Sequence, residues 1–268
     1  MPGNVGVLFV GDIIGRPGRQ AVEMLLPHLI SKYKPSVVIG NGENAAGGIG
    51  ITQDICRDLL KTFDLLTSGN HVWDKKEGAE CLTKEPRLIR PANYPEENPG
   101  QGTAVLTTKE GIKVGVMNLQ GRVFMEALAC PFRTADDCLE RLKTQTNIVI
   151  VDIHAEATSE KQALGWYLDG RVSAVFGTHT HVLTADAKIL PKGTAYLTDA
   201  GMAGGSQSVI GIRTDQAIDR FLSSRPHRFE PAKGPFSLSV VFAEIDSTTG
   251  KALSIAAETL LEEDLEGE

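Results

Sequence analysis

Several side chains that can bind cations or transfer protons stand where short apolar segments of the sequence end. They are Asp12, Glu43, Asn44, Asn70, His71, His154, His179 and His181. Four of the 6 histidines in the chain belong to this set. The apolar segments that precede these residues have the length and the Val/Ile content of buried strands. We therefore expect one kind of chemistry to explain why these side chains stand at the ends of the expected strands.

All of these groups offer nitrogen or oxygen donors, and none is a thiolate. Such a set suits manganese, iron or zinc and argues against a structural zinc site of the cysteine type. Six or seven donors are too many for one tetrahedral ion, but they fit two ions about 3.5–4 Å apart. A pair of ions needs a bridging carboxylate. We expect Glu43 to be the bridge, because a charge at the mouth of a buried strand needs a partner.

Each residue taken alone also has a structural explanation. Asp12, in "GDIIGRPG", suits an Asx turn or a helix cap, and Asn70 suits a turn. A lone His154 is typical of a core histidine bonded to a carbonyl group. The set as a whole favours a metal centre, because a potential metal ligand stands at the end of each of five separate expected strands.

Strand and helix patterns alternate through the first two-thirds of the chain, which predicts an α/β fold. Expected strands cover residues 5–10, 36–40, 64–70, 102–108, 112–119, 147–153, 172–177, 194–201, 237–246 and 252–260. Expected helices cover residues 19–34, 52–63, 74–85, 134–145, 160–168 and 214–224. In such folds the carboxyl ends of parallel strands share one edge of a sheet, and ligands bind at that edge.

Two hairpin patterns, at 102–119 and 237–260, add more antiparallel structure than a plain doubly wound sheet carries. We therefore predict one domain spanning residues 1–268, with two packed mixed β-sheets flanked by helices. The stretches 121–134 and 201–213 are expected to be irregular segments around the rim of a site.

Composition narrows the class of protein. The 268 residues are 41% hydrophobic and 23% charged, with a net charge of −7 and no basic stripe, which argues against duplex nucleic acid as a partner. The 4 cysteines form no CxxC pair, and neither a secretory signal nor a membrane span is recognisable. These features predict a cytoplasmic protein that does not bind membranes.

In its motifs the sequence resembles the calcineurin-like metallophosphoesterase superfamily. The matching motifs are "GD" at 11–12, "GEN" at 42–44, "GNH" at 69–71, "DIHAE" at 152–156 and "GTHTHV" at 177–182. Two positions depart from the usual pattern: Ile14 stands where a histidine is usual, and Glu43 replaces the usual bridging Asp. Both departures, with "NGENAAGGIGIT" and "TDAGMAGG", are similar to the bacterial YmdB-like phosphodiesterase subgroup.

This resemblance implies a centre of two metal ions, with iron expected and manganese or zinc as alternatives. It places Asp12, Glu43, Asn44 and His181 around the first ion. It places Glu43, Asn70, His154 and His179 around the second. It also makes His71 the catalytic proton donor, contacting the substrate together with Asn44, and it implies a dimer or tetramer.

The function predicted in this way is a hydrolase acting on phosphoric diesters, with 2′,3′-cyclic nucleotides as substrates. A hydroxide that bridges the two ions is expected to attack phosphorus while His71 protonates the leaving oxygen. The alternatives are a phosphomonoesterase or nucleotidase with the same site, and a non-catalytic nucleotide-sensing protein. Four residues keep two interpretations each, as pocket or as structural groups: Trp73, Arg122, Phe124 and Asp199.

Overall fold

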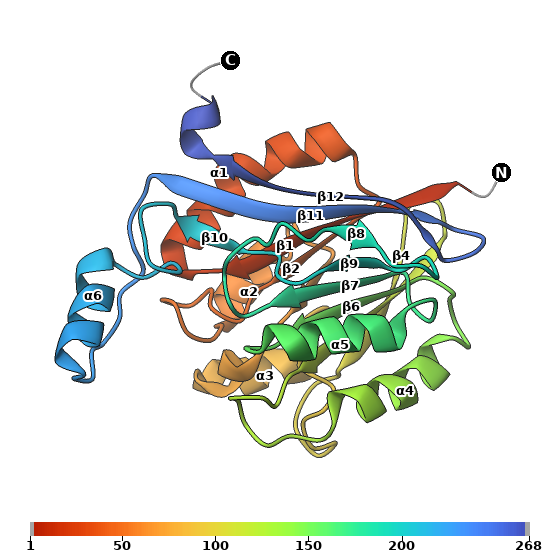
Figure 1. The fold of residues 1–268 in the computed structure, drawn as a ribbon, viewed down its shortest axis with the longest axis horizontal. Coiled ribbons are helices and arrows are strands. Elements are labelled where there is room, and N and C mark those ends of the chain that lie inside the picture. The colour runs from red at the N-terminus through yellow and green to blue at the C-terminus, as the bar shows by residue number, and fades with distance from the viewer. Residues whose placement is uncertain (1–2, 266–268) are drawn as a thin grey trace.

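Two six-stranded β-sheets packed face to face form the centre of this computed structural model, which describes residues 3–265 (Figure 1). The first sheet has the order β12-β11-β10-β1-β2-β3. Its strands are β1 (Asn4–Ile13), β2 (Val37–Asn41), β3 (Leu65–Thr67), β10 (Met202–Gly205), β11 (Phe236–Asp246) and β12 (Ala252–Leu261). β1 runs parallel to β2 and β10 and antiparallel to β11, so the sheet is mixed.

The second sheet has the order β4-β5-β6-β7-β9-β8. Its strands are β4 (Thr103–Thr107), β5 (Lys113–Gln120), β6 (Val149–His154), β7 (Ala174–Thr178), β8 (Lys188–Ile189) and β9 (Ala195–Leu197). Strands β5, β6, β7 and β9 are parallel to one another, while β4 and β8 are antiparallel additions at the edges. The predicted fold class, two mixed sheets with flanking helices, is confirmed.

Alternate residues of the strands fill the space between the sheets, as the two-residue period of a strand requires. Phe9 of β1 and Phe176 of β7 meet there with ring centroids 5.5 Å apart, and both are fully buried. Burial of one such side chain stabilises the fold by about 1.5–3 kcal/mol. This layer fixes the two sheets face to face.

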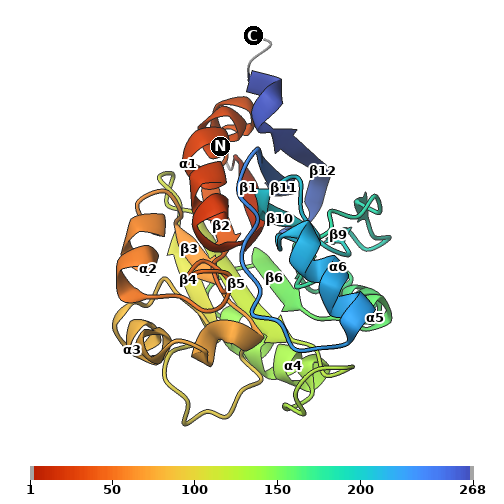
Figure 2. The same cartoon turned by 90° about the vertical axis from the view of Figure 1, so that its left-hand side faces the viewer.

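Helices cover the outer faces of both sheets (Figures 1 and 2). They are α1 (Gly15–Tyr33), α2 (Gln53–Leu59), α3 (Lys76–Lys84), α4 (Pro131–Leu142), α5 (Thr158–Leu168) and α6 (Thr214–Ser223), with short 3-10 helices η1 (Asn70–Trp73) and η2 (Glu262–Leu265). Helices α1, α2 and α3 pack on the first sheet, and α4 and α5 on the second. Helix α6 stands apart at the left of Figure 1. No helix in residues 3–265 has the length and apolarity needed to cross a membrane.

Three details differ from the sequence-based expectations. Helix α1 begins four residues before the predicted start, because Gly15 takes φ +58 and turns the chain directly from β1 into the helix. Strand β10 lies within the stretch 201–213, which was predicted to be irregular. Its glycine-rich sequence has a low strand propensity, but it pairs with β1 and β11. Helix α2 ends at Leu59, four residues before the predicted end, and the side chain of Thr52, which precedes the helix, makes no capping hydrogen bond.

Candidate metal centre

The predicted residues from five strand ends meet at the shared edge of the two sheets. His154 at the end of β6 is the middle of the group: its Nε2 lies 3.0 Å from Glu43 Oε1, 3.0 Å from Asn70 Oδ1 and 3.0 Å from His179 Nδ1. One donor atom from each of Glu43, His154 and His179 lies within 4.8 Å of the other two. Residues that are far apart in the sequence are therefore brought together at one place in the fold.

A second group of donors lies beside the first. His181 Nε2 is 3.8 Å from Asp12 Oδ1 and 3.4 Å from Asn44 Nδ2. The Asn44 amide donates to Glu43 Oε1 at 3.1 Å, so Glu43 contacts both groups. This arrangement matches the sequence-based division into two ligand sets that share Glu43. The role of these residues as metal ligands stays a prediction.

Glycine is required at position 69, where the chain passes against the donors. A Cβ built at Gly69 would lie 2.3 Å from both Glu43 Oε2 and His154 Nε2. Such a contact is far too short for any side chain. The "GNH" motif thus brings Asn70 next to the donors without obstructing them.

The loop after β7 holds its two histidines in an unusual backbone conformation. His179 has φ +93 and His181 has φ +62, in the left-handed region that costs energy for non-glycine residues. Thr180 between them donates its amide and its hydroxyl to Asp199 Oδ2, at 3.1 and 2.6 Å. The buried Lys161 donates to the same oxygen at 2.7 Å. Asp199 therefore stabilises this loop by accepting hydrogen bonds from it. Asp199 does not line the cavity that contains His71 and Glu43.

Hydrogen bonds behind His154 fix which of its nitrogens carries a proton. Thr178 donates its only hydroxyl proton to Asp152 Oδ1 at 2.7 Å, so its oxygen accepts from His154 Nδ1 at 2.9 Å. In the neutral ring Nε2 then carries a lone pair, which faces the oxygens of Asn70 and Glu43. Acceptors gathered in this way need a positive charge between them, either a proton on Nε2 or a metal ion.

Two further buried oxygens support the same conclusion. Asp12 Oδ1 and Asn44 Oδ1 have no hydrogen-bond partner among the described residues. A buried polar atom without a partner costs about 1–3 kcal/mol. Both belong to the predicted first-ion set, and with oxygen and imidazole donors only, the residues present fit a pair of hard or borderline divalent ions.

The electrostatics show how strongly this site favours positive charge. Burial alone disfavours protonation of His154, but Glu43, Asp12 and Asp152 outweigh it and raise its pKa to about 9. Burial opposes ionisation of Glu43 as well, yet His154 and the His71 amide lower its pKa to about 2. Burial raises the pKa of Asp12, and burial together with His154 lowers the pKa of His179 to about 3. The field that holds a proton on His154 equally favours a metal cation in its place.

His71 lies at the entrance to the donor cluster. Its backbone amide donates to Glu43 Oε2 at 3.0 Å, and its Nδ1 lies 2.6 Å from Asp74 Oδ2. The side chain is 35% exposed and lines a cavity of about 460 Å³. Asp74 thus orients an imidazole that is open to a ligand on its other side.

The same cavity contains most of the donors and an apolar wall. Its lining residues are Ile14, Glu43, Asn44, Gly47, Gly48, Ile49, His71, Glu156, His179, Thr180, His181, Ile210, Ile212 and Phe229. Ile14, at the position where the superfamily usually has histidine, contributes an apolar surface here. The cavity therefore offers donors on one side and hydrocarbon on the other.

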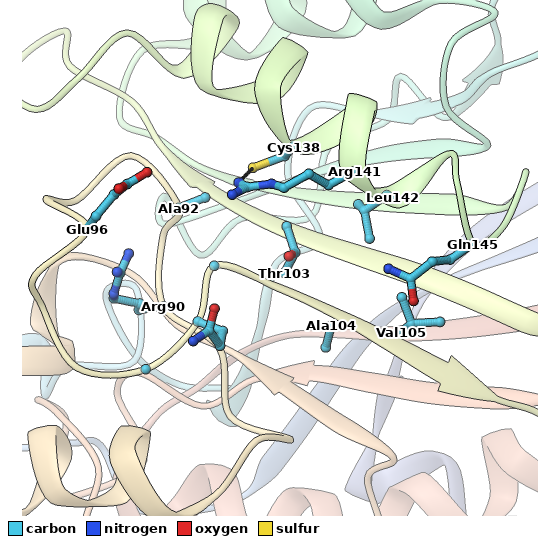
Figure 3. Close-up of a pocket in the computed structure, with 13 residues that line it drawn as sticks. Arg90, Ala92, Glu96, Thr103, Ala104, Val105, Cys138, Arg141, Leu142 and Gln145 are labelled. Atoms are coloured by element: carbon cyan, nitrogen blue, oxygen red, sulfur yellow. Dashed lines mark hydrogen bonds between the residues drawn. The ribbon is translucent and has the colours of Figure 1, made fainter.

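A larger cavity of about 520 Å³ lies elsewhere, between β4 and α4, and contains none of the predicted residues (Figure 3). Arg90 at its edge donates to the carbonyl groups of Pro91, Pro95, Asn98 and Pro99. Its guanidinium group is thus committed to holding the loop 91–99. The donor-rich cavity is the better candidate for chemistry.

The residues for which the sequence allowed both a pocket role and a structural role have structural contacts or lie outside the cavity. Trp73 packs edge-on against Tyr94 with centroids 5.4 Å apart. The Arg122 amide donates to Glu160, and neither Arg122 nor Phe124 lines the cavity. His227 Nε2 lies 2.5 Å from Asp219 Oδ2, and His227 is not among the residues lining the cavity.

Several partners of the site escaped the sequence analysis. Asp152 and Thr178 lie inside apolar runs and read as ordinary strand residues. Glu156, whose Oε2 is 3.1 Å from His179 Nε2, belongs to the quoted "DIHAE" motif, which was the available signal. Asp74, three residues after His71, offered only its spacing as a signal.

The paired mixed sheets, with nitrogen and oxygen donors at their shared edge, define a fold of the metallophosphoesterase type. Within that class the chain belongs to the YmdB-like protein family, whose model matches residues 8–257. It is 49% identical, over 93% of this chain and 94% of the relative, to a 2′,3′-cyclic-nucleotide 2′-phosphodiesterase of Bacillus subtilis (strain 168). It is 36% identical to a putative phosphatase/phosphodiesterase of Mycoplasma pneumoniae, over 98% of this chain and 96% of that one.

Solved structures agree with this assignment. A hypothetical protein from Thermus thermophilus superposes with a TM-score of 0.89 at 42% identity, covering 96% of this chain and 100% of the other. A crystal structure described as a novel phosphatase from Mycoplasma pneumoniae gives a TM-score of 0.90 at 35% identity, covering 100% and 98%. The fold is therefore shared across nearly the whole chain.

Proposed function

We propose that this protein is a metal-dependent phosphodiesterase that hydrolyses 2′,3′-cyclic nucleotides and related phosphodiesters. The observation that carries the proposal is the convergence of lone-pair donors on His154 Nε2, beside two buried oxygens without partners among the described residues. The name of the Bacillus relative supplies the substrate class.

Two metal ions are proposed, held by the sets given above with Glu43 shared between them. The family resemblance makes iron the expected metal, and a donor set without thiolate keeps manganese and zinc as alternatives. When bound, such ions neutralise phosphoryl charge and lower the pKa of coordinated water. The buried carboxylates and the fixed tautomer of His154 prepare the site for them.

His71 is proposed as the proton donor. Water adds to phosphorus as the bond from phosphorus to the ribose 2′ oxygen breaks, which leaves a nucleoside 3′-phosphate. The departing oxygen needs a proton, and His71 can give the one on Nε2, because Asp74 holds Nδ1. General acids of this kind typically contribute about 10²–10⁴ in rate. Asn44, which lines the same cavity, is proposed to contact the phosphoryl group.

A phosphomonoesterase using the same donors is the second candidate, since the names of the Mycoplasma relatives include phosphatase beside phosphodiesterase. The lining of the cavity favours the diester: no Lys or Arg is among the lining residues to balance the extra charge of a monoester. The remaining predictions, a homo-oligomer, a cytoplasmic location and a single domain over 1–268, stay predictions.

The test is a metal analysis of the purified protein, together with hydrolysis of a 4-nitrophenyl diester and the corresponding 4-nitrophenyl monoester. About two ions per chain and faster turnover of the diester are expected. Faster turnover of the monoester would favour the phosphatase. Protein without stoichiometric metal under any loading condition would favour the non-catalytic nucleotide-sensing alternative.

A further inference from the structure

Residues 206–235, called the arm here, connect β10 to β11 and carry helix α6. Figure 2 shows this segment passing in front of the open edge of the sheets. Three of its side chains, Ile210, Ile212 and Phe229, line the cavity that also contains His71 and Glu43. The arm thus supplies one wall of the candidate site, and its first part belongs to the stretch 201–213 that was predicted to lie at the rim of a site.

Ile210 connects this wall to the donors. Its φ of +47 is a genuine outlier for a β-branched residue, which normally avoids the left-handed region. The tight turn formed by Val209 and Ile212, with backbone hydrogen bonds of 2.9 Å in both directions, holds it there. The Ile210 carbonyl accepts from His181 Nδ1 at 2.9 Å, which leaves Nε2 of His181 on the side of Asp12. Strain of this kind persists at functional sites when the surroundings enforce it.

The charges around the cavity set a limit on what it accepts. Its lining residues include the acids Glu43 and Glu156 but no Lys or Arg. Glu156 is half exposed, and its partner is His179. Once ions at the donors hold one phosphoryl group, the lining has no Lys or Arg to balance the charge of a second one. Further phosphate would approach Glu156 and would be repelled.

The wall also lacks groups that read the edge of a base. Besides the donors, His71 and Glu156, the only polar side chain in the lining is Thr180. Its hydroxyl is already bonded to Asp199 and Lys161. What remains is aliphatic surface and the ring of Phe229, which is 42% exposed. The flat face of a nucleobase can pack on such a surface, and this contact does not depend on the hydrogen-bonding groups at the edge of the base.

We propose that the arm is the element that recognises the substrate, and that Ile210, Ile212 and Phe229 hold a nucleobase by apolar contact. The preferred ligand is then a nucleoside cyclic phosphate with one phosphoryl group and any base. This inference rests on the proposed function and specifies which diesters it covers. Phe229 and Ile210 become specificity-determining residues, and the Glu230 amide, which donates to Gln216 Oε1 at 2.8 Å, links α6 to the chain beside Phe229.

The experiment compares Phe229→Ala with Phe221→Ala. Both remove an aromatic ring from the arm, but Phe221 is 83% exposed on α6 and does not line the cavity. The substrates are 2′,3′-cyclic AMP, the same nucleotide with a 5′-phosphate, and methyl 4-nitrophenyl phosphate, which has no base. Binding of adenosine 3′-phosphate, measured by calorimetry, provides a readout that does not depend on turnover.

Phe229→Ala should lower the ratio of kcat/KM for cyclic AMP over that for the baseless diester by about tenfold or more, mainly through KM, and should weaken adenosine 3′-phosphate binding similarly. Phe221→Ala should leave the ratio and the binding at the wild-type values. The 5′-phosphate should reduce kcat/KM of the wild-type protein by about tenfold.

An unchanged ratio in Phe229→Ala would overturn the role of the arm, and equal turnover of the 5′-phosphorylated nucleotide would overturn the limit to one phosphoryl group. In either case hydrolysis of the baseless diester would still support the proposed function. If the wild-type protein hydrolyses none of the three diesters, the proposed function itself fails. Thermal unfolding of both variants excludes misfolding as the reason for a loss.

Discussion

Lys161 Nζ lies 2.7 Å from Asp199 Oδ2, and the structure buries both side chains almost completely. Lys61 and Asp58 lie at the same distance of 2.7 Å on the surface of the protein, where both are about two-thirds exposed. The two pairs have the same geometry and differ in burial. Only the buried pair supports the loop with His179 and His181, through the bonds from Thr180 to Asp199.

Replacing Lys161 by Met should destabilise the protein by about 3–5 kcal/mol, since it leaves the Asp199 carboxylate buried without its counter-ion. Urea unfolding of the metal-free protein measures this loss. Lys61→Met is the matched control and should leave the unfolding midpoint essentially unchanged, because exposed pairs contribute little. Adding Asp199→Asn to Lys161→Met should recover part of the loss. Equal effects of the two lysine substitutions would contradict the argument.

Thr178→Val should weaken metal binding by about 10–100-fold, a typical effect of removing a partner behind a ligand. Valine has nearly the same shape but cannot accept from His154 Nδ1 or donate to Asp152. Competition with a chelator measures the apparent affinity. Thr194→Val is the control: Thr194 is equally buried and bonds to Val172, but it lies away from the donors and should change stability without changing metal affinity.

Glu43→Gln should abolish binding of both ions, because the amide removes the negative charge that the two ligand sets share. In the wild-type protein, each ion at about 100 times its Kd should add about 2.7 kcal/mol to the free energy of unfolding. The variant should lack this stabilisation and show no metal by elemental analysis. Two ions retained by Glu43→Gln would remove the bridging role. Glu110→Gln, an exposed substitution of the same kind, should behave as wild type.

The location of the site was predictable because strand polarity carries over long distances. Asp12, Glu43 and His154 each end a parallel strand or directly follow one, and parallel strands place their carboxyl ends on one edge, whatever lies between them in the sequence. Periodicity also predicted the two sheets, since buried strands read as Val- and Ile-rich runs. The clustering of the donors could therefore be predicted without predicting the conformation of the loops.

The supporting contacts were not predictable in the same way. The hydroxyl of Thr178 reaches His154 and Asp152 across neighbouring strands, and the carbonyl of Ile210 reaches His181 from the arm. Neither contact produces a periodic pattern in the sequence. The first depends on strand register, and the second depends on the backbone conformation of Ile210. Strand β10 was missed for a related reason: glycine-rich segments have little intrinsic strand preference, and pairing with β1 and β11 decides the outcome.

His71→Ala, with metal content retained, should lower kcat by about 10²–10⁴ for diesters with poorly leaving alcohols, because those oxygens must be protonated as they depart. A 4-nitrophenyl diester leaves as a stable anion and should lose much less. The comparison is informative because the His71 side chain is not in either ligand set and contacts Asp74 on the exposed side. Asp74→Asn should give a smaller loss in the same pattern, since it changes only the orientation and basicity of the imidazole. An equal loss for both classes of leaving group would exclude proton donation by His71 and assign it to substrate positioning.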